Sequence, residues 1–135
     1  MKIVVDSYAW VEIFLGSEKG QFASQSIQDA EQVITPEIVL AEISRKYFRE
    51  GAKEQLIRSR LATISQSSEL SQLDETIAIE SGKAYLEISE KARKSKSRKP
   101  GLFDAIVLAT ARINKARVLT GDLHFRDIPE TIMLE

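Results

Sequence analysis

The chain has 135 residues, of which 43% are hydrophobic and 29% charged, which is the size and composition of one globular domain. Its net charge of −1 excludes a protein that binds nucleic acid through overall positive charge, so any such contact must depend on a local patch and a metal. The absence of cysteine excludes disulfides and thiolate metal sites, and no apolar run approaches the roughly 20 residues that cross a bilayer. We therefore expect one domain over residues 1–135 in a cytoplasmic protein, because the N-terminus also lacks the pattern of a signal peptide.

Predicted strands and helices alternate in the first half of the chain. The apolar run Lys2–Asp6 predicts a buried strand that ends in an acid, and Ser7 is expected to cap the helix that follows. Thr35 and Pro36 predict another helix start, with Thr35 as the cap and Pro36 at the first helical position. The elements predicted up to residue 67 are a strand at 2–6, helices at 8–15 and 19–30, a strand at 32–34, and helices at 36–50 and 53–67.

The second half continues the alternation around one basic loop. Asp74 is expected to cap a long helix that reaches the low 90s, and the loop at 91–101 closes with the breakers Pro-Gly. The other predicted elements are an apolar helix at 102–114 and strands at 69–73, 117–120 and 131–134. Because strands that alternate with helices form a parallel sheet covered on both faces, we predict an α/β fold, a three-layer α/β/α sandwich.

Four acidic residues stand where such a fold can gather them. Asp6 and Asp122 follow the first and fourth predicted strands, and functional sites of α/β sheets collect at the carboxyl ends of strands. Glu42 points along the apolar side of its helix, and Asp104 is the only acid in the helix at 102–114. Each acid also has a local explanation. The two at strand ends could be turn residues, Asp104 could complement the helix dipole, and Glu42 could pair with a base one turn away.

A cluster of four carboxylates would need a compensating charge. Two carboxylates roughly 4 Å apart repel each other by about 4 kcal/mol at the effective dielectric near a protein surface. The cluster therefore requires either protonation, which means raised pKa values, or a cation. Oxygen ligands with no histidine or cysteine nearby favour Mg²⁺ or Mn²⁺, and these ions activate water for the hydrolysis of phosphodiesters.

Four motifs in this order resemble the PIN-domain family. They are V-V-D-S at 4–7, a glutamate in a helix near residue 40, L-F-D-A-I-V-L-A-T-A at 102–111, and V-L-T-G-D-x-x-F at 118–125. Within the family, the chain is most similar to the small VapC-type toxins of toxin–antitoxin pairs. The resemblance implies a parallel sheet in the order 3-2-1-4-5 and Mg²⁺- or Mn²⁺-dependent endoribonuclease activity. It also implies an RNA substrate, a small antitoxin protein as partner, and a homodimer.

The family's site residues carry over to this chain motif by motif. The acids that match the metal site are Asp6, Glu42, Asp104 and Asp122, and the hydroxyls that match supporting positions are Ser7 and Thr120. Many relatives place a further acid shortly after the aspartate that matches Asp122, whereas this chain has His124 there and Asp127 as an additional acid at a different spacing. The number of metal ions therefore stays open. We expect His124 to be a surface or loop residue rather than a catalytic base, and Phe125 to pack this loop down.

The basic loop is the second candidate site. Six of the nine residues from 91 to 99 are Lys or Arg, and the loop immediately precedes Asp104. Cations at this place could bind the phosphates of RNA and offset the repulsion between an acidic site and its substrate. The candidates for this contact are Lys94, Lys96, Arg98 and Lys99. The alternative is a solvated helix end whose cations suit the helix dipole.

Three rival functions stay open beside the toxin endoribonuclease. The first is a PIN nuclease that acts in RNA processing or decay without an antitoxin. The second is a catalytically silent module of the same fold that binds RNA or protein. The third is a phosphatase, and the sequence disfavours it because Asp6-Ser7-Tyr8 lacks the second aspartate two residues on that a haloacid-type phosphatase would supply.

Overall fold

The computed structural model describes residues 1–135, and its strands form a single parallel sheet. The strand order is β3-β2-β1-β4-β5, and every neighbouring pair is parallel. The strands are β1 (Lys2–Val5), β2 (Gln32–Pro36), β3 (Glu69–Ser71), β4 (Arg117–Thr120) and β5 (Thr131–Met133). The predicted fold class and the strand order implied by the resemblance are both confirmed.

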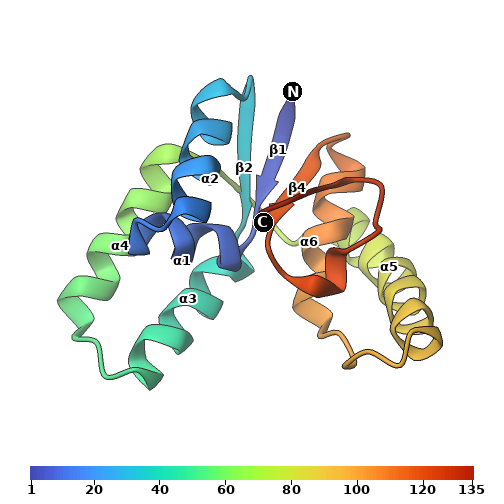
Figure 1. Cartoon of the computed structure of the whole chain (residues 1–135). Helices are drawn as coiled ribbons and strands as arrows, with labels where there is room; N and C mark the ends of the chain where they lie inside the picture. Colours follow the sequence, from blue (N-terminus) through green and yellow to red (C-terminus); the bar gives the residue numbers. More distant parts are fainter.

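Helices cover the sheet on both faces. They are α1 (Ser7–Leu15), α2 (Glu18–Asp29), α3 (Ile38–Arg49), α4 (Glu54–Ser67), α5 (Glu75–Lys94) and α6 (Leu102–Ile113). Figure 1 shows α1 to α4 gathered on one side of the strands and α5 and α6 on the other, which is the predicted three-layer arrangement. None of these helices combines the length and the apolar character needed to span a membrane.

The two central strands place the candidate site. β1 and β4 pair in register, with Val5 opposite Leu119, so both strands end at the same edge of the sheet. Val5 and Leu119 are fully buried, as expected for central strands of a sheet that is covered on both faces. Asp6, which follows β1, and Thr120, the last residue of β4, are therefore held side by side by a rigid part of the core.

Two predicted helix starts are wrong. Thr35 and Pro36 belong to β2, and α3 begins only at Ile38, because Thr35 pairs with β3 and its hydroxyl accepts a hydrogen bond of 3.1 Å from the indole of Trp10. Ser7 is the first residue of α1 rather than its cap. The cap is Asp6, whose Oδ1 accepts a hydrogen bond of 3.0 Å from the amide of Ala9.

The basic loop is shorter than predicted. Helix α5 continues to Lys94, so the first four residues of the predicted loop are helical. Asp74 does cap this helix, since its carboxylate accepts a hydrogen bond of 2.9 Å from the amide of Ile77. The non-helical part, residues 95–101, leads directly into α6 and brings its cations close to the carboxyl edge of the sheet.

Candidate metal centre

Asp6 and Asp122 are linked through the hydroxyl of Thr120. This hydroxyl accepts a hydrogen bond of 2.9 Å from the amide of Asp122. It also hydrogen-bonds the carboxylate of Asp6, which favours the ionised form of that acid. Thr120 is fully buried and Asp6 is 6% exposed, so the link lies inside the protein. Thr120 thus lies beside both acids.

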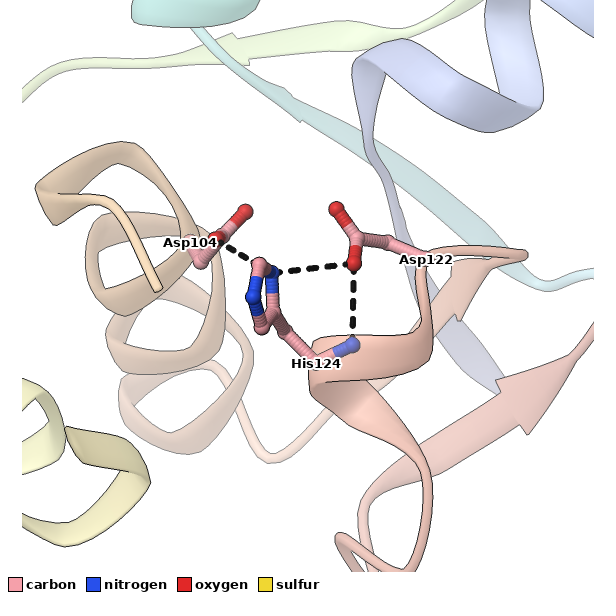
Figure 2. Close-up of side chains that lie close together, drawn as sticks. All are labelled: Asp104, Asp122 and His124. Atoms are coloured by element: carbon pink, nitrogen blue, oxygen red, sulfur yellow. Dashed lines mark hydrogen bonds and ion pairs between the residues drawn. The ribbon is translucent and has the colours of Figure 1, made fainter. Parts of the chain in front are cut away.

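A second group of side chains meets beside this link. His124 Nδ1 lies 3.2 Å from Oδ2 of Asp104 and 3.1 Å from Oδ1 of Asp122 (Figure 2). One donor atom from each of the three residues lies within 4.8 Å of the others. Asp104 comes from the first turn of α6, whereas Asp122 and His124 flank the start of the 3₁₀ turn η1 (Leu123–Phe125). Segments of the chain about twenty residues apart therefore build one site.

Glu42 approaches the same group from α3. The pKa of Glu42 is raised to about 7 in total: burial and the charges of Asp104 and Asp122 raise it, whereas Arg45 and the hydroxyl of Ser7 lower it. All four predicted acids are thus electrostatically coupled, because the pKa of Asp6 also responds to Glu42. The hydroxyl of Ser7 is thus close to the carboxylate of Glu42.

The local salt bridge considered for Glu42 does not form. Lys46 pairs instead with Glu50, at 2.6 Å between Nζ and Oε2. The guanidinium carbon of Arg45 lies 5.8 Å from the ring centroid of Phe103, which is a cation–π arrangement. Glu42 therefore faces the other acids without a bonded cation, which makes the functional explanation of this residue the stronger one.

Burial dominates the electrostatics of Asp6. The pKa of Asp6 rises from the ordinary 3.8 to about 7, chiefly because of burial, and the charges of Asp122 and Glu42 act in the same direction. Hydrogen bonds from Thr120 and the amide of Ala9 oppose this rise. Burial and the charge of Asp122 also raise the pKa of Asp104, against the amide of Gly101. The metal-free protein thus holds a group of acids in which ionisation is unfavourable, and a cation would relieve this.

The local explanation of the aspartates holds and is compatible with a functional one. Asp104 Oδ2 accepts a hydrogen bond of 3.1 Å from the amide of Gly101, and Asp122 Oδ1 accepts one of 2.9 Å from the amide of His124. Asp6 caps α1 in the same way. Each aspartate is thus fixed by an amide at the start of a helical turn, and in Figure 2 the remaining oxygens of Asp104 and Asp122 point to the same side. Helix-start contacts orient these carboxylates for ligand binding.

His124 lies in the connection between β4 and β5, as expected of a loop residue, but it is not a surface residue. Its side chain is only 11% exposed, and Nδ1 is buried among the acids without a hydrogen-bond partner. The donor set of the centre therefore includes an imidazole nitrogen, which the sequence analysis excluded. The spacing D-x-H could have indicated this contact, because a 3₁₀ turn that begins after Asp122 brings the side chain two residues later, His124, back to the cluster. Phe125 is 1% exposed and packs the turn down as predicted.

The surroundings of His124 Nδ1 indicate whether the centre can bind a metal ion. A buried polar atom without a partner is costly, and the two carboxylate oxygens within 3.2 Å of Nδ1 only accept hydrogen bonds when ionised, so they can pair with this nitrogen only through a proton or a cation. A divalent cation satisfies all three donor atoms at once, and carboxylate together with imidazole is a donor set that such ions accept. The residues present therefore fit the metal that the resemblance implied.

Asp127 is not part of the cluster. It is exposed and adopts a left-handed backbone conformation, with φ of 68°. Its carbonyl accepts a hydrogen bond of 2.8 Å from Nζ of Lys91. Asp127 thus closes the end of the turn after Phe125 and lines a neighbouring groove instead of joining the acids.

A groove with basic residues on its wall adjoins the cluster. Its volume is about 870 Å³, and it reaches Asp122 and His124. The cations that line it are Lys19, Lys91, Arg98 and Arg126. Of the four candidates for RNA contact, Arg98 lies on this wall, and Lys94, Lys96 and Lys99 do not. The sequence analysis missed Lys19 and Arg126, because α2 and the turn after η1 meet the basic loop only in the folded chain.

Tyr8 and Gly121 shape the floor of this groove. A Cβ built on Gly121 would lie 2.2 Å from Cε1 of Tyr8, so only glycine allows the ring to lie against the backbone there. The phenol oxygen of Tyr8 accepts a hydrogen bond of 3.1 Å from Nζ of Lys19, which holds that cation at the groove. The contact lies directly beside Asp122.

Comparisons with known proteins agree with this architecture. A family model described as PIN domain matches residues 3–131, and no curated protein matches the chain. A toxin–antitoxin complex from Klebsiella pneumoniae is similar with a TM-score of 0.72 and 22% identity, covering 98% of both chains. VapBC2 from Rickettsia felis, bound to a DNA fragment from its promoter, is similar with a TM-score of 0.72 and 18% identity, covering 98% of this chain and 97% of that chain. VapC20 from Mycobacterium tuberculosis, a toxin that cleaves the sarcin-ricin loop, is similar with a TM-score of 0.63 and 17% identity, covering 91% of this chain and 92% of that chain. At these identities the likeness shows the fold.

Proposed function

The chain belongs to the PIN-domain family, and from this membership we propose that it is a divalent-metal-dependent endoribonuclease that hydrolyses RNA phosphodiester bonds. The observation that carries the proposal is the meeting of Asp104, Asp122 and His124 within 4.8 Å, with Asp6 and Glu42 coupled to them. Mg²⁺ and Mn²⁺ are the proposed ions. The family and the fold support a nuclease of the VapC type.

The acids have separable roles in this proposal. Asp104 and Asp122 would hold the cation, since their oxygens are oriented by backbone amides at the open end of the sheet. The cation supplies Lewis-acid activation of water and stabilises negative charge on the phosphate. Asp6 and Glu42, which are coupled to this pair, are suited to orient water and to accept its proton. No side-chain nucleophile is required.

The groove supports RNA as the substrate. Its cations can bind phosphates on one side of the cut and reduce the repulsion between the acids and a polyanion. The similar VapC20 is a toxin that cleaves the sarcin-ricin loop. Replacing Lys19 and Arg126 with glutamine should weaken RNA binding. The slope of log affinity against log salt concentration should become shallower by about one for each phosphate contact that is lost.

A matched control separates the groove from the rest of the basic segment. The same double replacement at Lys94 and Lys96, outside the groove wall, should have a smaller effect on RNA affinity. RNA binding by fluorescence anisotropy at several salt concentrations measures both. Equal losses in the two double variants would show that the basic segment acts through its overall charge and that the groove has no particular role.

The proposal includes a partner and a setting. Several similar structures are toxin–antitoxin complexes, which supports a small antitoxin protein that binds this chain and silences it. We propose a homodimer and a cytoplasmic location, where RNA substrates are found. A chain that cuts RNA but binds no protein encoded beside it would instead be a PIN nuclease of RNA processing.

RNA cleavage by the purified protein tests the activity. Structured and single-stranded RNAs are incubated with Mg²⁺, with Mn²⁺ and with a chelator, using the wild type, Asp104→Asn and Asp127→Asn. Cutting should require metal, disappear in Asp104→Asn and persist in Asp127→Asn, because only Asp104 belongs to the cluster. A folded protein that cuts no RNA and gains no stability from either metal would be the silent binding module.

A further inference from the structure

The imidazole of His124 has a defined tautomer in this fold. Its Nε2 lies 2.9 Å from the backbone carbonyl oxygen of Arg98. A carbonyl oxygen can only accept a hydrogen bond, so Nε2 carries the hydrogen in this contact. In the neutral ring the other nitrogen, Nδ1, then has a free lone pair, and this lone pair faces the carboxylates of Asp104 and Asp122.

This arrangement lacks one positive partner. Nδ1 is buried and has no hydrogen bond, and the two nearest oxygens, at 3.1 Å and 3.2 Å, belong to acids. While Nδ1 carries no proton, its lone pair held against two carboxylates is repulsive unless a cation lies between them. Adjacent ligand atoms of a six-coordinate ion with bonds of about 2.1 Å are about 3 Å apart. The observed separations match those of ligand atoms that share one ion.

We propose that His124 is a direct ligand of the divalent cation through Nδ1, and that this nitrogen makes the centre prefer Mn²⁺ to Mg²⁺. Mg²⁺ is bound by oxygen ligands and keeps several waters, whereas imidazole is a common ligand of first-row transition metals, so replacing one oxygen ligand by imidazole penalises Mg²⁺ more than Mn²⁺. The inference rests on the metal dependence in the proposed function. Many relatives carry a further acid at the position of His124, so the proposed nitrogen ligand distinguishes this chain from them.

Arg98 has a positioning role in this scheme. Its carbonyl fixes the ring of His124, as the outer hydrogen bonds of metal-bound histidines commonly do. The same residue lines the basic groove, and its charge is near enough to lower the pKa of Asp104, which burial raises. One residue thus connects the substrate groove with the ligand that sets metal preference.

A nitrogen signal on bound Mn²⁺ tests the ligand without any mutation. His124 is the only histidine of the chain, so labelling tag-free protein with ¹⁵N-histidine marks this ring alone. Pulsed electron paramagnetic resonance of the Mn²⁺-loaded wild type should show an imidazole ¹⁴N coupling that changes to a ¹⁵N coupling in the labelled protein. Bound Mn²⁺ without that coupling, or no bound Mn²⁺ at millimolar metal, would overturn the proposal.

Metal affinities of variants test the preference. Calorimetric titrations compare wild type, His124→Asn and His124→Asp, with circular dichroism of each metal-free protein as the check on folding. His124→Asn should lose on the order of tenfold or more in Mn²⁺ affinity and less in Mg²⁺ affinity, and His124→Asp should shift the preference toward Mg²⁺. An unchanged ratio of the two affinities in both variants would contradict the assignment.

The two proposals fail in different ways. Metal-dependent RNA cleavage without a nitrogen coupling would leave the endoribonuclease intact and remove His124 from the ligands. A nitrogen coupling in a protein that cuts no RNA would keep His124 as a ligand and overturn the proposed activity.

Discussion

Replacing Asp6 with asparagine should stabilise the metal-free protein at high pH. Burial, and then the charges of Asp122 and Glu42, raise the pKa of Asp6 from 3.8 to about 7. A group with a higher pKa in the folded state stabilises the fold below its unfolded pKa, and this contribution is lost as the pH rises through the folded pKa. The stability of the wild type should therefore fall from about pH 4 to about pH 7 on account of Asp6.

The magnitude follows from the size of the rise. At about 1.4 kcal/mol per pKa unit, a pKa of about 7 in place of 3.8 corresponds to about 4 kcal/mol at pH 8. At pH 5 only part of this stabilisation is lost. The free energy of unfolding of Asp6→Asn, relative to that of the wild type, should therefore rise by about 3 kcal/mol from pH 5 to pH 8. Asparagine keeps the cap of α1, because its side-chain oxygen can still accept from the amide of Ala9.

Urea unfolding in the presence of a chelator, followed by circular dichroism, measures this difference. Asp74→Asn is the matched control, since Asp74 caps α5 with the same type of hydrogen bond but is exposed. Its difference from the wild type should be the same at both pH values. A gain for Asp6→Asn that does not grow with pH, or that Asp74→Asn reproduces, would refute the argument that ionising Asp6 is costly in the metal-free fold.

Three further predictions concern the same edge of the sheet. Gly121→Ala should cost about 1–3 kcal/mol of stability and slow RNA cleavage, because its Cβ would meet an aromatic ring at 2.2 Å. Gly82→Ala is the control, because a Cβ there meets nothing within 4 Å, and it should be neutral or stabilising. Equal losses of thermal stability in the two alanine variants would contradict the packing argument. Thr120→Val should cost about 1–3 kcal/mol and weaken Mn²⁺ binding in calorimetry, whereas Thr120→Ser keeps the hydroxyl and should bind normally; normal binding by the valine variant would remove Thr120 from the site. Mn²⁺ should raise the melting temperature more at pH 8 than at pH 5, since protons compete with the ion for acids whose pKa is raised; a larger rise at pH 5 would oppose this.

The positions of the acids could be predicted because they follow from simple rules of the fold. Asp6 and Asp122 come directly after apolar strands, and the parallel pairing of those strands brings their ends together. Glu42 lies on the apolar side of a helix that packs on the sheet. Periodicity and strand-end position contain this information without any knowledge of long-range contacts.

The features that were missed depend on contacts between distant segments. His124 joins the centre because η1 turns its ring toward Asp104 on α6, a geometry that its local sequence indicates only weakly. Thr35 and Pro36 form a good local helix start, but pairing with β3 keeps them in the sheet. Lys19 reaches the groove through its hydrogen bond to Tyr8 on another helix, which charge patterns along the chain do not indicate.

The central claim is that the acids at the carboxyl edge of the sheet share a divalent cation. Anomalous diffraction from crystals grown with Mn²⁺ would test this claim most directly. We predict a manganese peak in contact with the carboxylates of Asp104 and Asp122, the two acids whose oxygens lie nearest to Nδ1 of His124. A structure with these acids in place but no such peak, or with Mn²⁺ bound only at other surfaces, would contradict the account.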